Sequence, residues 1–200
     1  MHDKQSDNAV RVTCAVAGEA ELCWNIDQAL HSGLPDATER GFFLQGSTLE
    51  DYREFQKSAI FYVARYGDEL SGFVIALPSG HPRFVSLLEK RQAFSLSSED
   101  ILAIPNLIWI AKVAVLRKKA RCGIGTALYA HLFAAYPASA MITATLIEPV
   151  YNLASARFHE KMGFAKVGTI DSGDRGELKK CKSAVIFLEF NSPVSPRHRS

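Results

Sequence analysis

One stretch in the middle of the chain constrains the fold more than any other. Residues 107–116 are apolar and β-rich, four cations follow within residues 117–121, and Gly123 and Gly125 precede a helical pattern over 124–136. A strand that leads through a short loop into a helix is a building unit of mixed α/β domains. The sequence therefore predicts a buried strand, a basic glycine loop and a helix in that order.

The glycine loop also predicts a ligand. Glycines let backbone N–H groups approach a ligand closely, and the first turn of a helix has unpaired N–H donors with a partial positive charge. With Arg117 and Arg121 beside these donors, the loop favours an anion such as a phosphate group. The alternative interpretation is a solvated basic turn whose glycines serve tight packing.

Two well-known phosphate-binding patterns do not fit this loop. A dinucleotide fingerprint needs a third small residue where the chain has Leu128, and it needs an acidic residue about twenty positions further on. A P-loop needs Gly-Lys followed by Ser or Thr, and the sequence contains no such triplet. These comparisons exclude a Rossmann-type dinucleotide site and disfavour a nucleoside triphosphate site.

The rest of the chain predicts one α/β domain over residues 1–190. The length of 200 residues and a hydrophobic share of 48% suit one domain with a sizeable core. Hydrophobic periodicity predicts about six or seven strands in a mixed central sheet flanked by helices. The expected strands are 11–17, 60–66, 70–77, 107–116, 141–147, 166–169 and 184–190, and the expected helices are 19–30, 48–58, 124–136 and 152–162.

Two segments stand apart from this pattern. Residues 79–106 lack strand alternation and are bounded by prolines, so we expect an insertion on the substrate side, with a short helix within 83–93. Residues 191–200 are rich in proline, serine and arginine, and we expect a flexible tail there.

Charge and cysteine content narrow the function classes. The net charge of +2 gives no reason to expect a nucleic acid or a membrane as partner. The four cysteines include no C-x-x-C pair, so we expect reduced thiols and no metal. Residues 1–10 lack an apolar run behind a positive start, so no signal peptide is expected and the cytoplasm is the expected compartment.

A second constellation lies about thirty residues after the glycine loop. Asn152, Ser155 and His159 lie on one side of a predicted helix, and Phe158 borders them in a neighbouring apolar stripe. A helix of this kind can anchor on a sheet and present its polar side to a ligand. Asn152 also fits a simple helix N-cap, and both roles stay open.

These two motifs resemble the GNAT superfamily of acyl-CoA-dependent N-acyltransferases. Gly123 and Gly125 match its loop pattern, although Ala120 stands where Arg or Gln is usual and Arg121 follows one residue later. The run from Asn152 through Ser155 and His159 to Gly163-Phe164 matches its fourth-motif helix. The resemblance implies a GNAT-like domain with splayed central strands, acetyl-CoA as co-substrate and no metal.

The resemblance also assigns roles to residues. The loop is expected to hold the coenzyme A pyrophosphate, and a backbone N–H of the 113–115 strand is expected to hold the oxyanion. His159 stands where most relatives carry the tyrosine acid; a packing or ligand-binding histidine, with water or Tyr151 as proton source, is the alternative. Glu148 is the candidate base, or else an exposed glutamate, and Lys112 points out of the sheet or into the cleft. The expected cofactor-binding residues are Val113, Ala114, Val115, Arg117, Arg121, Cys122, Gly123, Ile124, Gly125, Thr126, Asn152 and Ser155.

The expected reaction is acetyl transfer from acetyl-CoA to the primary amine of a small molecule by direct attack. Acetylation of a protein or peptide, or a non-catalytic acyl-CoA sensor, are the alternatives. Phe42-Phe43 and Trp109 are candidates for an apolar acceptor pocket, although aromatic residues at such positions are more often core. Relatives often form homodimers, and nothing in these residues decides whether this chain does.

Overall fold

A computed structural model describes residues 9–30, 33–34, 36–44, 46–89, 91–94, 101, 103–175 and 177–188. The predicted tail 191–200 lies outside the described residues. Within them, one mixed sheet of eight strands has the order β1-β2-β3-β5-β6-β8-β7-β4. The strands are β1 Val10–Cys14, β2 Ile60–Tyr66, β3 Glu69–Pro78, β4 Arg91–Phe94, β5 Ile108–Val115, β6 Met141–Glu148, β7 Ala165–Arg175 and β8 Leu178–Leu188.

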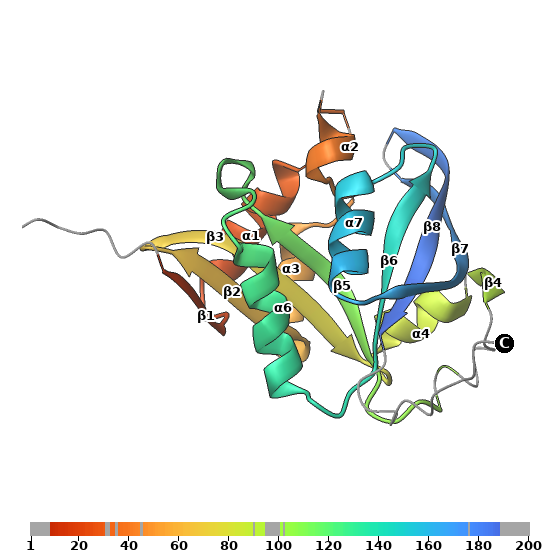
Figure 1. Cartoon of the computed structure of the whole chain (residues 1–200), viewed down its shortest axis with the longest axis horizontal. Coiled ribbons are helices and arrows are strands. Elements are labelled where there is room, and N and C mark those ends of the chain that lie inside the picture. The colour runs from red at the N-terminus through yellow and green to blue at the C-terminus, as the bar shows by residue number, and fades with distance from the viewer. Residues whose placement is uncertain are drawn as a thin grey trace, which may run out of the picture.

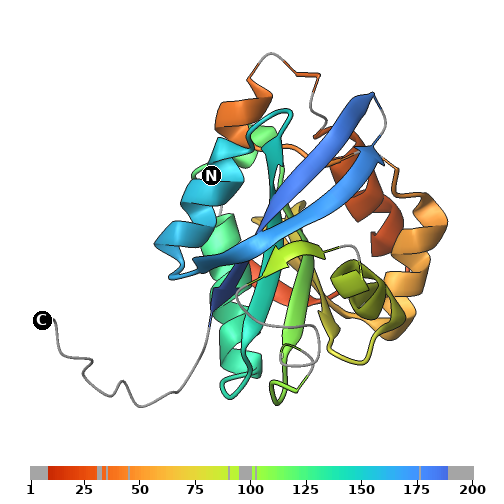
Figure 2. The same ribbon diagram turned by 90° about the vertical axis from the view of Figure 1, so that its right-hand side faces the viewer.

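Helices cover both faces of this sheet (Figures 1 and 2). On one face, α1, α3 and α4 pack on side chains such as Phe73 and Ile142. On the other face, α6 and α7 pack over Val74 and Ile110. The helices are α1 Glu19–Gln28, α2 Ala37–Arg40, α3 Leu49–Ser58, α4 Pro82–Glu89, α6 Ile124–Ala135 and α7 Leu153–Lys161, with a 3-10 turn η1 at Arg117–Lys119. The prediction of a single mixed α/β domain is confirmed.

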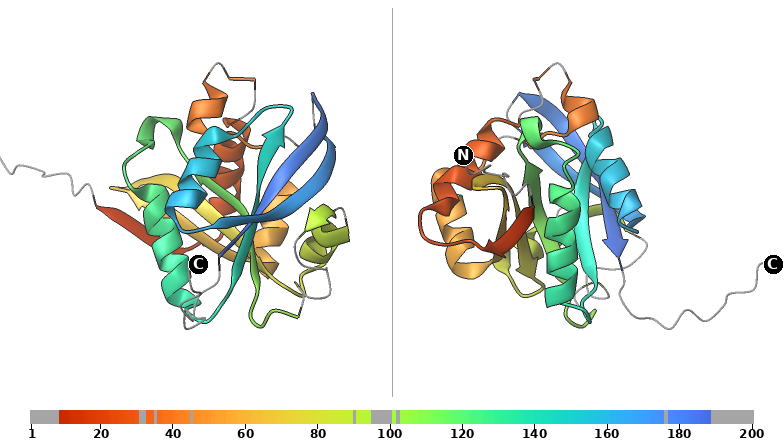
Figure 3. Two further views of the ribbon diagram at one scale, coloured as in Figure 1. Left: turned by 45° about the vertical axis from the view of Figure 1, so that its right-hand side comes forward. Right: turned by 60° about the vertical axis from the view of Figure 1, so that its left-hand side comes forward.

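The central strands diverge as expected. β5 and β6 are parallel but pair only from Ile108 to Ile110, opposite Met141 to Thr143. Beyond Ile110, β5 stays paired with β3 alone, and a bulge in that ladder falls between Ile110 and Lys112. A bulge bends the strand that carries it. The two strands therefore open into a V, which Figures 1 and 3 show between β5 and β6.

Segment 79–106 differs from the expectation of a substrate wall. It forms α4, close to the predicted short helix, and β4, the eighth strand, which pairs with β7 at the edge of the sheet. Phe84 and Leu88 of α4 are fully buried against Leu107 and Ile142, at the end of the sheet where β5 begins. None of its described residues lines the cavity between β5 and β6.

Candidate active site

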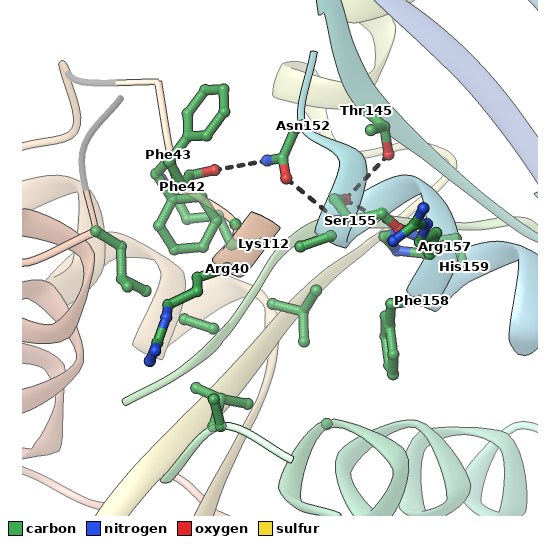
Figure 4. Close-up of a pocket in the computed structure, with 18 of the residues that line it drawn as sticks. Arg40, Phe42, Phe43, Lys112, Thr145, Asn152, Ser155, Arg157, Phe158 and His159 are labelled. Carbon is green, nitrogen blue, oxygen red and sulfur yellow. Dashed lines mark hydrogen bonds between the residues drawn. The ribbon is translucent and has the colours of Figure 1, made fainter. Parts of the chain in front are cut away.

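The opening between β5 and β6 leads into a cavity of about 1210 Å³. Its wall comes from segments far apart in the sequence: Leu30 just after α1, the segment 39–44, the second half of β5, the glycine loop, β6, α7 and Ser183 of β8 (Figure 4). We call the part lined by residues 113–126 and α7 the cofactor half. We call the part lined by Leu30, segment 39–44, Lys112, the middle of β6 and Ser183 the acceptor half.

The glycine loop has the expected shape. Gly123 has φ +79°, a conformation that favours glycine, and it caps the N-terminus of α6 without a side-chain hydrogen bond. A Cβ on Gly125 would lie 3.3 Å from the Phe158 ring, so a side chain here would push against α7, and glycine suits this close approach of α6. The first amides of α6 thus face the cavity with no side-chain cap to satisfy them, as an anion site requires.

Arg117 adds an incompletely satisfied cation to the cofactor half. Its Nη2 pairs with Asp36, while its Nη1 is buried and has no hydrogen-bond partner in the described structure. A buried guanidinium nitrogen without an acceptor is unfavourable, and a phosphate oxygen would relieve this cost. Arg121 and Arg157 also line the cavity. The residues present therefore suit a phosphate-bearing ligand.

The free edge of β5 supplies further donors. Leu116 N–H donates to Ser71 O on β3 over 2.8 Å. Because successive amides along a strand point to opposite edges, the N–H groups of Val113 and Val115 point away from β3 and into the opening toward β6. This edge of β5 can pair with an extended ligand that lies in the V.

Asn152 caps α7 and also fastens a distant segment. Its side-chain oxygen accepts from Ser155 N–H over 3.1 Å, which confirms the predicted N-cap. Its side-chain nitrogen donates to the carbonyl oxygen of Phe42 over 2.9 Å. The buried Asn152 amide is therefore occupied by the protein on both sides, and it acts on the cavity by positioning Phe42.

His159 is placed unfavourably for an acid. It is 2% exposed, its Nδ1–H donates to the carbonyl oxygen of Ser155 over 2.7 Å, and its Nε2 accepts from the Tyr129 hydroxyl over 2.7 Å. Burial lowers the pKa of His159 to about 4, against which the Ser155 carbonyl acts only weakly. At neutral pH this imidazole is uncharged and both nitrogens are engaged. The expectation that it protonates the leaving thiolate is not supported by this geometry.

The candidate base lies outside the cavity. Glu148 ends β6 on the surface and forms an ion pair with Lys182, Nζ to Oε2 3.4 Å, in which both side chains are about half exposed. It does not line the cavity, and neither do Cys122 and the exposed Tyr151. The alternative of an exposed glutamate fits this placement. The other predicted site residues line the cavity: Val113, Ala114, Val115, Arg117, Arg121, Gly123, Ile124, Gly125, Thr126, Asn152, Ser155 and His159.

Residues 39–44 form one wall of the acceptor half and belong to the segment 36–44, which we call the strap. Phe42 is buried against Leu146 of β6 and Cys181 of β8 in a small apolar cluster. Phe43 stacks on Phe73 with ring centroids 6.3 Å apart and also lines the cavity. Aromatic residues at such positions are more often core, as the sequence predicts for this pair. The pair is core and cavity wall together, whereas Trp109 packs on Phe84 and does not line the cavity.

A buried ion pair lies beneath the strap. Lys112 Nζ is 2.6 Å from Asp27 Oδ2 on α1, and the Tyr52 hydroxyl donates to the same oxygen over 2.5 Å. The Lys112 ammonium also lies 4.6 Å from the centre of the Phe43 ring. Burial and the adjacent carboxylate raise the pKa of Tyr52, so the phenol keeps its proton and donates it in the hydrogen bond to Asp27 Oδ2. Lys112 thus points toward α1 and lines the acceptor half, an arrangement that the sequence left open.

Neither a metal site nor a membrane-spanning helix is found among the described residues. They contain no group of three or more His, Cys, Asp or Glu side chains that could hold a metal ion. In the part of the chain that the structure describes, no helix has the length and apolar character needed to cross a membrane.

Comparison with known protein families identifies the family of this chain. The model of the acetyltransferase (GNAT) family matches residues 27–164, which include the glycine loop, β6 and α7. The chain belongs to the GNAT acetyltransferase family. Membership confirms the resemblance carried by the two motifs, and it supports acetyl-CoA as the co-substrate. No curated protein matches the chain.

Solved structures of GNAT proteins share the fold over nearly the whole chain. The ribosomal-protein-S18-alanine N-acetyltransferase from Escherichia coli has a TM-score of 0.64 at 11% identity, with 95% of this chain and 99% of that chain covered. NAA60 from Arabidopsis thaliana with a bisubstrate analogue has a TM-score of 0.66 at 15% identity, with coverages of 92% and 99%. Arabidopsis thaliana Naa50 with the analogue CoA-Ac-MVNAL has a TM-score of 0.58 at 14% identity, with coverages of 90% and 99%. Identities this low establish the fold alone.

Proposed function

We propose that this chain transfers an acetyl group from acetyl-CoA to the primary amine of a small molecule. The proposal rests on the hydrogen-bond donors that gather in the cofactor half of the cavity. Uncapped amides at the start of α6, the unsatisfied Nη1 of Arg117 and the free edge of β5 meet in one cavity. This set of donors matches a ligand with a pyrophosphate at one end and an amide-containing arm at the other.

The position of the free β5 edge suggests how the acetyl group is transferred. The acceptor nitrogen attacks the thioester carbonyl carbon, and the N–H of Val113 donates to the oxygen that becomes negatively charged. The C–N bond forms, the C–S bond breaks, and the electron pair of that bond leaves on the coenzyme A sulfur. The nitrogen then loses a proton and the thiolate gains one.

Water is the proton carrier in this account. Among the described lining residues, Glu39 is the one carboxylate and is exposed, and His159 is buried with both nitrogens engaged. The hydroxyls of Thr145, Ser155 and Ser183 line the path between the two halves and can order a chain of waters. The acceptor amine then loses its proton to solvent through this chain.

The strap supports a small acceptor. Phe42 packs on Leu146 and Cys181, so the strap and the β7–β8 hairpin meet above the acceptor half. The Asn152 amide holds the Phe42 carbonyl, and Asp36 is tied to Arg117. An acceptor half with a wall fastened in this way suits a compact amine better than an extended peptide, which needs an open groove.

The test combines a binding and a transfer measurement. Acetyl-CoA is titrated calorimetrically into the protein, and release of the free thiol is then followed with a panel of small amines and short peptides with free N-termini. Binding with thiol release for a small amine supports the proposal. Release with peptides alone moves the acceptor to proteins, and binding without release for any acceptor makes the chain an acyl-CoA sensor. Absence of binding overturns the proposal.

A further inference from the structure

The Lys112 ammonium is buried but its hydrogen bonding is incomplete. Its side chain is 12% exposed, and Asp27 Oδ2 accepts the one hydrogen bond it makes with the described residues. The rings of Phe43 and Tyr52 flank it, with centroids 4.6 and 5.6 Å from Nζ. An ammonium has three donors, and a buried cation needs acceptors for them. The open side of this cage is the acceptor half of the cavity.

Helix α1 makes a second ion pair with the sheet, and this pair lies outside the cavity. Glu19, at the start of α1, pairs with Arg65 of β2, and this carboxylate is as well buried as Asp27. Both pairs tie α1 to the sheet, one at each end of the helix. Arg65 does not line the cavity, whereas Lys112 does. Fastening α1 therefore does not require a cation that faces the acceptor half.

The side chains that line the acceptor half include more cations than carboxylates, and each of these cations is held by a carboxylate partner. Arg40 and Lys112 are its cations, and Glu39 is the one carboxylate among the described residues that line it. Arg40 is paired with Asp36 over 2.6 Å, and both Arg40 and Glu39 are exposed. Lys112 is thus the more shielded cation that an acceptor meets, and although Asp27 offsets part of its charge, its free N–H donors suit a carboxylate and not a second ammonium.

We propose that Lys112 is a specificity residue that selects acceptors carrying a carboxylate close to the amine, as in an amino acid. The inference rests on the proposed acetyl transfer to a small amine. The acceptor carboxylate takes the free donors of the Lys112 ammonium, and Asp27 and Tyr52 hold that ammonium from behind. The amine then points toward the opening between β5 and β6. Diamines and polyamines are poor acceptors, because their second ammonium meets Lys112.

The test compares acceptors that differ in the carboxylate alone. Initial rates of acetyl transfer are measured for L-amino acids and for their carboxamides, and each pair gives a ratio of kcat/KM. In Lys112→Met we expect this ratio to fall at least about tenfold relative to the unaltered protein, since a hydrogen bond to a charged group contributes about ten- to a hundredfold in binding. The rates with carboxamides fall less, because a neutral carboxamide loses a hydrogen bond to Lys112 but no attraction between opposite charges.

Two other variants separate selection from folding. Arg65→Met removes the matched ion pair outside the cavity, and we expect it to leave the ratio unchanged. Asp27→Asn frees Lys112 from its carboxylate while keeping an acceptor for Tyr52, and we expect the ratio to be kept or to rise. If Lys112→Met does not fold, the double variant with Asp27→Asn removes both charges together and is measured in its place.

The outcomes distinguish this inference from the proposed function. Calorimetric binding of acetyl-CoA to every variant shows that the cofactor half is intact. Equal use of amino acids and carboxamides by the unaltered protein, or an unchanged ratio in Lys112→Met, overturns the role of Lys112 and leaves acetyl transfer standing. Absence of acetyl-CoA binding to the unaltered protein overturns the proposed function itself.

Discussion

The two halves of the cavity are built in different ways. The cofactor half comes largely from fourteen consecutive residues, 113–126, which form one strand edge, one loop and one helix start. The acceptor half comes from Leu30 after α1, the strap, β5, β6 and β8, which meet only in the folded chain. A site made of consecutive residues can be recognised in a sequence, whereas one assembled from five segments depends on the packing of the whole domain.

The largest predicted effect tests the cofactor half. Gly125→Leu places a side chain where a Cβ alone would lie 3.3 Å from the Phe158 ring, next to the first amides of α6. We expect acetyl-CoA binding to weaken by about a hundredfold, since the loss of two charge-assisted hydrogen bonds costs about 3 kcal/mol or more. Titration calorimetry measures the change.

Gly80→Leu is the matched control for this variant. A Cβ on Gly80 would have no neighbour within 4 Å. This control should bind acetyl-CoA as the unaltered protein does. Similar binding by both variants would contradict the assignment of the cofactor half.

The second prediction concerns the stability of the unaltered chain in acid. The folded pKa of His159 is about 4 and lies below its ordinary value of 6.5, so the unfolded chain takes up a proton first. The stability that neutral His159 provides is complete above pH 6.5 and is lost as the pH falls toward 4. Between pH 7 and pH 5 we expect a loss of about 2 kcal/mol from this residue. Urea unfolding at both pH values measures it.

His159→Phe removes this contribution and also tests the acid role. The difference in stability between pH 7 and pH 5 should shrink by about the same 2 kcal/mol. His131→Gln, an exposed histidine on α6, serves as control. Turnover of the folded His159→Phe protein should stay within about threefold, since the imidazole is neutral and engaged. A drop of a hundredfold or more, with a lost acid limb in the pH profile, would restore the acid role.

A smaller effect is expected for Arg117→Ala. Its unsatisfied Nη1 is the donor that we assign to a phosphate, and the expected loss in acetyl-CoA affinity is about tenfold. Arg53→Ala, an exposed arginine on α3 that pairs with Glu50, is the control and should bind normally. If Arg117→Ala binds acetyl-CoA as tightly as the control does, Arg117 serves only to hold Asp36 of the strap through its Nη2.

The smallest effect is expected for Glu148→Gln. This carboxylate lies on the surface in an exposed ion pair with Lys182, and such pairs contribute about 0–1 kcal/mol. We expect kcat to change by less than about threefold across the pH range, because a water chain and not Glu148 removes the proton. A loss of two orders of magnitude at low pH, relieved as the pH rises, would identify Glu148 as the base after all.

The fold was largely predictable because its elements have strong local signals. The periodicity of apolar residues predicts seven of the eight strands and the four helices α1, α3, α6 and α7, and the capping pair Thr48 and Asp51 marks the start of α3 close to the predicted residue 48. β4 was missed because it lies in a segment without alternation and is a short edge strand. Its pairing with β7 is a tertiary contact, which no local pattern reports.

The same reasoning explains what was missed in the site. His159 is hydrogen-bonded to Tyr129, which lies thirty residues earlier on α6. The position of His159 in its motif therefore predicted a residue in the cleft, but no nearby residue in the sequence predicted that it is buried. A signal for Lys112 was present: a lysine inside an otherwise apolar buried strand needs a partner. The partner, Asp27, lies 85 residues earlier in the chain, and only the fold brings the two together.

The most direct test of the account is a crystal structure of the protein with coenzyme A. The account predicts the pyrophosphate at the amides of residues 123–126 with Arg117 Nη1 on a phosphate oxygen, and the pantetheine arm along the edge of β5 at Val113 and Val115. The thiol should lie in the opening between β5 and β6, facing Lys112 and the strap. Coenzyme A bound elsewhere, or an arm that does not reach β5, would contradict it.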